Sequence, residues 1–346
     1  MLNPCYCIRP SMQKIPIVHI GLGPLGIKLL ELMAERKTAF QLCAAVDINP
    51  EIKGKSVSDL TGRAEYSGVV VSGDIPSAAS CRDSPDPVAI LTTVSTLAAI
   101  SPQITACLNA GYHVVSTCEE LAFPSHQNLK LSHAIDETAK QNGRAVLGTG
   151  VNPGFMMDFL PQALTAVSHR VDRVVVERFQ DASLRRLPFQ KKVGGGLSVE
   201  EFAKRKKDGS LRHVGLEESM HLIAAQFGWE LERTEDMIEP VVAQDDFQNG
   251  QTVIPSGHCL GVSQTGRGYR MGREVITLHF KASLGLPNPF DRIVIEGEPR
   301  IESVILGGIS GDIATCSIAL NACRTIRKLS PGLKTMGEIP AISWFE

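Results

Sequence analysis

Two adjacent glutamates are the residues of this sequence whose placement most suggests chemistry. Glu119 and Glu120 stand in the stretch VVSTCEELAFP, where a short apolar run ends. A carboxylate in that position can accept or donate a proton and can stabilise a positive charge that forms beside it. Because successive side chains of an extended segment point to opposite sides, only one glutamate can face a given pocket unless the chain turns between them. We expect Glu119 to be the catalytic residue; the alternative is a solvated acidic turn with no chemical role.

A glycine-rich stretch, GLGPLG at residues 21–26, has the spacing of a turn that binds pyrophosphate. Gly21 would permit the tight turn, Gly23 would let the backbone approach the phosphates, and Gly26 would let a helix pack against a strand. Together with Pro24 and Leu25, these glycines predict a dinucleotide-binding site. The alternative is an ordinary glycine turn.

Asp47 ends the apolar run FQLCAAVD that follows the glycine turn. An acidic residue in this place typically hydrogen-bonds the ribose hydroxyls of the bound dinucleotide. Asp47 should repel the 2′-phosphate of NADP, whereas Asn49, Lys53 and Lys55 lie close behind it in the sequence and can accept that phosphate. We therefore expect NAD(H) as the cofactor, with NADP(H) also used.

Small and polar residues follow three further apolar runs, and we expect them to contact the cofactor. They are Thr92, Thr93, Val94 and Ser95 after PVAIL, Thr117 after YHVVS, and Gly150 and Asn152 at the end of AVLGTGVN. In a parallel sheet, ligands bind beyond the carboxyl ends of the strands, because the crossover helices cover both faces. Ser95 or Thr96 can also serve as the N-cap of the helix expected to follow.

The elements that must position these residues alternate between strand and helix in the first part of the chain. IPIVHI, FQLCAAVD, PVAIL, YHVVSTC and AVLGTG predict strands, with helical segments at 27–33, 97–109 and 128–142. Near-continuous runs of Val, Ile and Leu are typical of strands buried on both faces. We predict an α/β fold whose residues 14–150 form a Rossmann domain with a doubly wound parallel sheet, preceded by an N-terminal extension at 1–13.

The pattern changes beyond Gly150. RVDRVVVERF, MGREVITLHFKASL and FDRIVIEGEP alternate apolar and polar residues, as antiparallel strands with one exposed face do, and a charged helical segment lies at 199–228. We predict that residues 151–307 form a second, α+β domain with a mixed or antiparallel sheet. This domain would cover the open end of the first and bind the substrate.

The composition argues against several kinds of partner. Thirty-five basic residues stand against 37 acidic ones, a balance that does not favour nucleic acid or an anionic membrane. The apolar stretches fall short of the roughly 20 residues of a membrane span, and the first dozen residues lack the apolar segment of a signal peptide. The nine cysteines have no zinc-binding spacing, and Cys5 and Cys7 are too close for a zinc knuckle. We expect reduced, buried thiols in a cytoplasmic protein and assign no metal.

Five stretches together resemble the 2,4-diaminopentanoate dehydrogenase family and the related NAD(P)-dependent amine dehydrogenases, a branch of the dihydrodipicolinate-reductase-like proteins. These stretches are GLGPLG, VVSTCEELAFP, GTGVNPGFMMD, ERFQDASLRRLPFQKKVGGGL and GGISGDIATCSIALNA. The resemblance spans most of residues 15–346. The region SLRRLPFQKKVGGGL departs from dihydrodipicolinate reductases, since it lacks their His-His-x-x-Lys stretch and their Ser-Gly-Thr anion clamp, so a lysine-pathway reductase is not expected.

The resemblance implies oxidative deamination of small amines, reversible as reductive amination of ketones or aldehydes with ammonia, with hydride carried by a nicotinamide cofactor. In that reaction Glu119 would accept a proton from ammonia or the carbinolamine and would stabilise the iminium cation. The resemblance also implies a homodimer built through the second sheet, and a C-terminal segment, 308–346, that returns to the nucleotide-binding domain. Two alternatives remain open: an alcohol or amino-acid dehydrogenase on the same scaffold, and a non-catalytic NAD(P)H sensor.

Residues from both parts of the chain are expected to contact the substrate, and each has a structural alternative. Glu120 can instead contact the backbone or the opposite domain, Phe155 and Met156 can pack in a core, Arg178 can serve a dimer interface or hinge, and His258 can be a structural group. Thr315 would approach the substrate or cofactor from the start of the last helix. The predicted substrate contacts are Glu120, Phe155, Met156, Arg178, His258 and Thr315.

Overall fold

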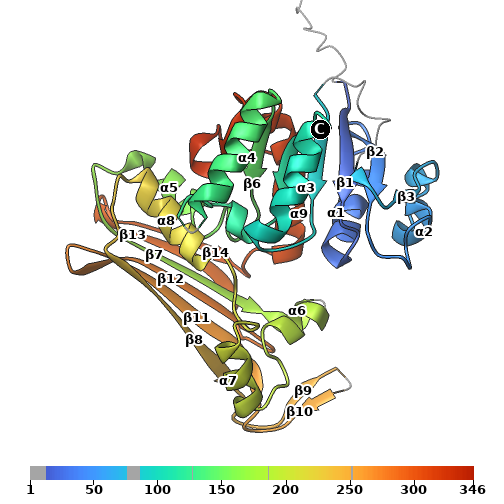
Figure 1. Cartoon of the computed structure of the whole chain (residues 1–346). Coiled ribbons are helices and arrows are strands. Elements are labelled where there is room, and N and C mark those ends of the chain that lie inside the picture. The colour runs from blue at the N-terminus through green and yellow to red at the C-terminus, as the bar shows by residue number, and fades with distance from the viewer. Residues whose placement is uncertain (1–12, 76–85, 127, 186, 251) are drawn as a thin grey trace, which may run out of the picture.

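The computed structural model describes residues 13–75, 86–126, 128–185, 187–250 and 252–346, and this part of the chain contains two large sheets (Figure 1). Helices separate the sheets, and the two halves of the molecule meet along the carboxyl ends of the first sheet's strands. The expected N-terminal extension falls outside the described residues, apart from Gln13.

Within the described residues the first sheet has seven strands, and all of its pairings are parallel. Its spatial order is β15 (Gly332–Lys334), β6 (Ala145–Gly148), β5 (His113–Ser116), β4 (Val88–Leu91), β1 (Ile15–Ile20), β2 (Phe40–Val46) and β3 (Val71–Ser72). Every residue of β1, β4, β5 and β6 is buried, as expected of strands covered on both faces. The predicted doubly wound parallel sheet is therefore confirmed.

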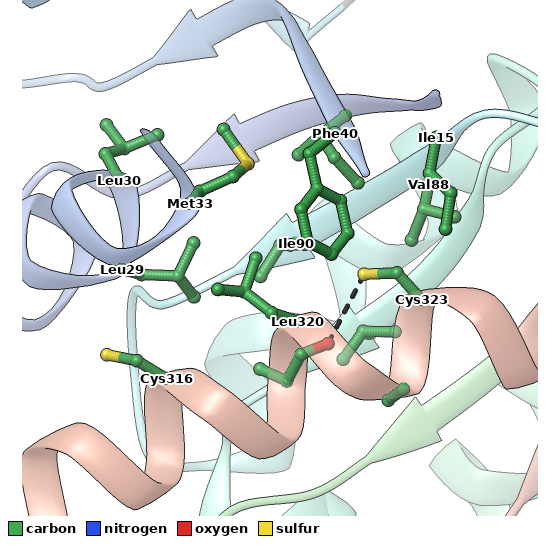
Figure 2. Packing of buried hydrophobic residues seen from close by; sticks show 14 of the residues in the cluster. Ile15, Leu29, Leu30, Met33, Phe40, Val88, Ile90, Cys316, Leu320 and Cys323 are labelled. Atoms are coloured by element: carbon green, nitrogen blue, oxygen red, sulfur yellow. Dashed lines mark hydrogen bonds between the residues drawn. The ribbon is translucent and has the colours of Figure 1, made fainter. Parts of the chain in front are cut away.

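Helices cover both faces of the first sheet. They are α1 (Pro24–Ala34), α2 (Val57–Thr61), α3 (Leu97–Asn109), α4 (Leu129–Gln141) and α9 (Gly311–Ile326). Figure 2 shows side chains of α1 and α9, among them Leu29 and Leu320, packed around Ile90 of β4. Residues of α3 and α4 pack with Val18 and Leu91 in a separate cluster. Because α9 and β15 come from the end of the chain, the C-terminal segment completes the first sheet and one of its cores.

The second sheet is mixed, with six strands in the part of the chain that the structure describes. Its spatial order is β14 (Ile301–Leu306), β13 (Phe290–Glu298), β7 (Arg170–Asp181), β12 (Arg273–Ser283), β11 (Cys259–Arg270) and β8 (Arg233–Val242). The pairing of β12 with β7 is parallel and the others are antiparallel. Buried residues alternate with more exposed ones along β7, so only one face of the sheet borders the core. A separate hairpin contains β9 (Phe247–Asn249) and β10 (Thr252–Ile254).

Four helices accompany the second sheet: α5 (Phe159–Leu164), α6 (Leu187–Lys192), α7 (Val199–Lys207) and α8 (Leu216–Gln226). In Figure 1, α5, α6 and α8 lie on the side of the sheet that faces the first half of the molecule, whereas no described helix covers the opposite side. Met220 and Ile223 of α8 pack with Ile276 and Leu278 of the sheet. The loop between α7 and α8 reaches the junction of the two halves.

The cysteines follow the expectation with one exception. Cys107, Cys118, Cys259, Cys316 and Cys323 are buried free thiols, whereas Cys43 is disulfide-bonded. Cys43 is half-buried on β2, next to the edge strand β3 of the first sheet. The predicted thiols Cys5, Cys7 and Cys81 lie outside the described residues. Over the described ranges, no helix has both the length and the hydropathy needed to cross a membrane.

Candidate active site

The glycine-rich turn joins β1 to α1 and leaves one face of the backbone clear. Gly21 has a φ of 95°, a conformation that favours glycine. A Cβ atom on Gly26 would lie 1.9 Å from the carbonyl oxygen of Gly21, whereas one on Gly23 would meet no described atom within 4 Å. Helix α1 begins at Pro24, and no side chain caps its first turn. An open backbone face and the unpaired N–H groups of a helix start suit a pyrophosphate.

Asp47, at the end of β2, holds this turn in place. Its carboxylate oxygens accept hydrogen bonds from the backbone N–H groups of Leu22 (2.6 Å) and Asn49 (2.8 Å). Beneath the turn, Nε2 of the buried His19 lies 3.0 Å from the carbonyl oxygen of Gly21. Burial lowers the pKa of His19 to about 4, so the turn rests on a neutral imidazole. Asp47 therefore shapes the turn and stands at the strand end expected for a ribose contact.

The loop after β4 borders the same turn. The hydroxyl of Thr92 donates a hydrogen bond to the carbonyl oxygen of Gly21 (2.8 Å), and that of Thr93 donates to the side-chain oxygen of Gln103 (2.9 Å). Thr93 and Val94 are exposed. The stretch from Thr92 to Ser95 thus lies beside the glycine turn, at the carboxyl ends of the strands, where the sequence predicts a cofactor contact.

A cavity of about 240 Å³ lies between the two halves of the molecule. The first half and α9 contribute residues that are predicted from the sequence, and β7, α6 and the loop before α8 contribute the opposite wall. The residues used below are Leu25, Thr117, Glu119, Gly150, Asn152, Arg178, Arg185, Phe189, Lys192, His213, Phe280 and Thr315. The cavity therefore combines the predicted catalytic carboxylate with aromatic and cationic side chains.

Glu119 lines this cavity from a single 3₁₀ turn, Glu119–Leu121, that directly follows β5 and Thr117. Its side chain is 20% exposed, and its Oε1 atom lies 3.9 Å from Nζ of Lys192. Lys192 ends α6, so this ion pair joins the two halves of the molecule across the cavity. The carboxylate is thus held beside the cavity by a cation from the opposite wall.

Glu120, predicted as a substrate contact, does not line the cavity and contacts the backbone instead. Its Oε2 atom accepts a hydrogen bond of 2.7 Å from the backbone N–H of Leu97, the first residue of α3. Thr96 is the N-cap residue of that helix but makes no capping bond with its side chain. A carboxylate at a helix start satisfies a free N–H and interacts well with the helix dipole. Because the chain turns at Glu119, the two glutamates point to different places.

Asn152 and His213 form a hydrogen-bonded pair on the cavity wall, through Nδ2 of the amide and Nε2 of the imidazole. The Oδ1 atom of Asn152 is buried and has no hydrogen-bond partner among the described residues. The pKa of His213 is lowered to about 3, first by burial and then by the positive charges of Lys192, Arg178 and Arg185. His213 therefore stays neutral at neutral pH and orients the Asn152 amide.

Arginines occupy the end of the cavity beside the second sheet. Arg178 is 1% exposed; its Nη2 donates a hydrogen bond of 2.8 Å to the carbonyl oxygen of Ile309, and its Nη1 lies 3.5 Å from Oδ1 of Asp291. Burial lowers the pKa of Arg178 to about 10, and the charge of Asp291 opposes that shift. Arg185 makes two hydrogen bonds to Asp312, the shorter of 2.8 Å. Arg178 is thus the more deeply buried of the two cations.

Four other predicted residues fall in different places. Thr315 lines the cavity, and its hydroxyl accepts a hydrogen bond of 3.2 Å from the backbone N–H of Val151. Phe155 stacks on Phe159 instead, Met156 is buried in the core of the second half, and His258 lies in the corner before β11, with its carbonyl oxygen bonded to the N–H of Ala243. The chain turns sharply at Gly154, which has a φ of 122°. Phe155, Met156 and His258 are not among the residues that line the cavity.

The described residues fit a nicotinamide dinucleotide. The cleared backbone of Gly23 and the start of α1 suit the pyrophosphate, and Asp47 lies at the ribose position. From Leu25 the path continues into the cavity past Thr117 and Gly150, where the unpaired Oδ1 atom of Asn152 can accept a hydrogen bond. These residues would hold the cofactor with its reactive end near Glu119.

Several cavity residues were not predicted from the sequence. Lys192 and Phe189 belong to a charged stretch in which no spacing distinguishes one position from the next, and His213 lies in a loop inside a segment predicted as helical. Phe280 alternates inward on β12 like any core residue. These residues become neighbours only where α6 and the loop before α8 contact the first half of the molecule, and no local sequence pattern indicates that contact.

This sequence is similar to known protein sequences over most of its length. A family model described as the 2,4-diaminopentanoate dehydrogenase C-terminal domain matches residues 155–345. The 2,4-diaminopentanoate dehydrogenase of Acetoanaerobium sticklandii is 30% identical over 341 residues, which cover 95% of this chain and 94% of that protein.

Solved structures show the same fold. An amine dehydrogenase from Mycobacterium smegmatis superposes with a TM-score of 0.83 at 19% identity, covering 97% of this chain and 98% of that one. A probable dehydrogenase from Thermotoga maritima superposes with a TM-score of 0.55 at 15% identity, covering 94% and 92%. With the family model and the relative at 30% identity, the conclusion is that this chain belongs to the 2,4-diaminopentanoate dehydrogenase family.

Proposed function

We propose that this protein is an NAD(P)-dependent amine dehydrogenase that deaminates small aliphatic amines and, in reverse, aminates ketones and aldehydes with ammonia. Membership of the family gives the reaction class. The observation that carries the assignment is the position of Glu119, whose carboxylate lines a cavity that begins at the end of the cofactor-binding turn.

Reductive amination requires proton transfers that Glu119 is placed to perform. Ammonia adds to the carbonyl carbon, and the former carbonyl oxygen takes up a proton from solvent to become a hydroxyl. A carboxylate can then take the extra proton from nitrogen and return it to this hydroxyl, which leaves as water. The resulting iminium cation is stabilised by the same carboxylate. The bound coenzyme supplies the hydride that reduces this cation, and accepts it in the opposite direction. Lys192, 3.9 Å from Glu119, holds the carboxylate in place between these steps.

The rest of the cavity supports the selection of small substrates. Phe189 and Phe280 provide apolar walls, and Thr315 provides a hydroxyl. Arg178 is buried at the far end, and its Nη1 atom makes no hydrogen bond to any described residue, so we propose that it contacts a second polar group of the substrate.

We propose the cofactor contacts from the turn and the strand ends around it. The preference is for NAD(H), because the Asp47 carboxylate would repel a 2′-phosphate, with NADP(H) also accepted. The proposed contacts are Gly21, Gly23, Pro24, Leu25, Gly26, Asp47, Asn49, Thr92, Thr93, Val94, Ser95, Thr117, Gly150 and Asn152.

We further propose that residues 14–150 and 308–346 form the nucleotide-binding domain, and that residues 151–307 bind the substrate and form a homodimer through the bare face of the second sheet. The pairing of β15 with β6 supports the first division. On the bare face, Phe179 contacts His279 and Phe290, with ring centroids 4.7 and 4.8 Å away, and this aromatic group supports an interface. Light scattering of the purified chain tests the dimer.

The ammonia dependence of turnover tests the proposed function. The protein is mixed with NADH or NADPH, ammonium and a panel of small ketones and aldehydes, and oxidation of the coenzyme is followed at 340 nm. We expect oxidation that requires both ammonia and carbonyl compound. Oxidation without ammonia would indicate an alcohol dehydrogenase, and coenzyme binding with no oxidation would indicate a sensor; either result refutes the proposal.

A further inference from the structure

Three potential metal ligands meet where the loop after Glu119 touches helix α8. His126 comes from that loop, and Glu217 and His221 lie one turn apart at the start of α8. One ligand atom from each residue lies within 4.8 Å of the other two. The Nε2 atom of His126 is 3.2 Å from Oε1 of Glu217, and the two imidazole rings stack with centroids 3.4 Å apart.

Ordinary side-chain interactions explain only part of this cluster. The His126–Glu217 pair is about a third exposed on both sides, and an ion pair of this kind contributes at most about 1 kcal/mol. Nε2 of His221 is buried and has no hydrogen-bond partner among the described residues. A buried nitrogen without a hydrogen-bond partner lowers the stability of a folded protein, so a ligand bound to this atom would explain its position.

The donor set is that of a zinc-class ion. Two imidazole nitrogens and one carboxylate oxygen are preferred ligands of Zn²⁺ and its neighbours, whereas Mg²⁺ and Ca²⁺ prefer oxygen ligands alone. Tetrahedral bonds of about 2.0–2.1 Å place ligand atoms roughly 3.4 Å apart, close to the separation of His126 and Glu217. The rings must turn from their stacked arrangement for both lone pairs to reach one ion, and His126, which is on a loop, has room to do so.

The cluster connects two segments that line the cavity. His126 follows the 3₁₀ turn that carries Glu119, and α8 begins just after His213. We propose that His126, Glu217 and His221 form a three-ligand site for a divalent transition ion of the zinc class, with water as the fourth ligand. The ion fastens the Glu119 loop to α8 and so stabilises the closed junction of the two halves.

Calorimetric titration of the full chain with Zn²⁺ tests this site without any measurement of turnover. We expect one ion per chain, and no binding of Mg²⁺. Replacing a hydrogen-bonded residue behind a metal ligand typically weakens binding about 10–100-fold, so His126→Ala, Glu217→Gln and His221→Gln should each weaken Zn²⁺ binding at least about tenfold. His133→Ala, at an exposed histidine of α4, is the matched control and should bind Zn²⁺ normally.

Thermal unfolding gives a second readout. Zn²⁺ should raise the melting temperature of the wild-type and His133→Ala proteins and leave that of His221→Gln unchanged. If His221→Gln folds poorly without the ion, the exposed His126→Ala variant replaces it in the comparison. The proposal is overturned if the wild-type protein binds no Zn²⁺, or if all four variants bind it equally. Because neither readout uses an amine or coenzyme, failure of the metal site and failure of the proposed enzyme activity are distinguishable.

Discussion

Replacement of Glu119 by glutamine tests the central assignment most directly. The change keeps the size of the side chain but removes the charge and the ability to transfer a proton. A positioned acid or base contributes about 10²–10⁴-fold to a rate, which corresponds to about 3–5 kcal/mol of transition-state stabilisation. We therefore expect kcat for reductive amination to fall by that factor in Glu119→Gln, while the coenzyme dissociation constant, measured by fluorescence, stays within about threefold.

A loss of folding cannot account for an effect of this size. The variant breaks an ion pair with Lys192, but Lys192 is 46% exposed and the charges are 3.9 Å apart, so the pair contributes at most about 1 kcal/mol. Glu120→Gln is the matched control. It removes the neighbouring charge but keeps an oxygen that can accept the Leu97 N–H, so it should cost about 0.3–1 kcal/mol of stability and leave kcat within about twofold.

The pair of variants also separates the two glutamates in one experiment. Glu119 is not the catalytic residue if Glu119→Gln keeps more than a tenth of the wild-type kcat, or if Glu120→Gln loses activity and Glu119→Gln does not. A parallel loss in both variants, accompanied by equal drops in melting temperature, would show that the segment is structural.

Three further predictions follow from the geometry. Gly23→Ala should fold normally, because its Cβ enters open space, but that space is where the pyrophosphate is expected, so NADH binding should weaken at least about tenfold in a fluorescence titration. Gly26→Ala should fold poorly, because its Cβ would overlap the Gly21 carbonyl. Equal NADH affinity in Gly23→Ala and wild type would contradict the predicted pyrophosphate site. Arg178→Met should lower the free energy of unfolding, measured in urea, by about 3–5 kcal/mol, because it leaves Asp291 buried without its counter-charge. Adding Asp291→Asn to the same chain should recover part of that loss. An Arg178→Met protein as stable as wild type would refute the buried ion pair. The pKa values of His19 and His213 are lowered to about 4 and about 3, below the unfolded value near 6.5, so the stability that these neutral imidazoles contribute is full above pH 6.5 and declines as the pH falls towards the folded pKa values. Urea unfolding should show a free energy of unfolding that decreases from pH 6.5 to 4, and that decreases less steeply in His213→Asn. An unchanged slope in His213→Asn would contradict the assignment.

The sequence predicts most of the first sheet because its strands satisfy a local rule. PVAIL and AVLG are apolar throughout and IPIVHI is apolar except for His19, as expected of strands that are buried on both faces. In the second half, β7, β12 and β13 are predicted from their alternation, but β8, β11 and β14 are not. The inner face of β11 carries glycines and polar residues, among them Gln264 and Gly266, so its sequence does not alternate between apolar and polar residues as a recognisable strand would.

The residues of the candidate site likewise fall into those that a local pattern predicts and those that depend on long-range contacts. Residues that follow a strand, such as Glu119 and Asn152, are predictable because the carboxyl ends of parallel strands share one edge. Glu120 is adjacent in sequence to Glu119, yet a single 3₁₀ turn directs it to α3. Lys192, His213 and the His126 cluster depend on contacts between segments far apart in the sequence, and no local pattern encodes them.

The return of the C-terminal segment to the first sheet has a consequence for synthesis of the chain. During synthesis the first half of the molecule emerges from the ribosome before α9 and β15, so the side of its core that contains Leu29 stays uncovered until these elements follow. The final aromatic residue, Phe345, then closes against Phe40, with ring centroids 5.5 Å apart. Nascent chains interrupted before α9 would therefore expose apolar surface and become substrates for chaperones or proteases, so that only full-length translation yields a binding-competent product.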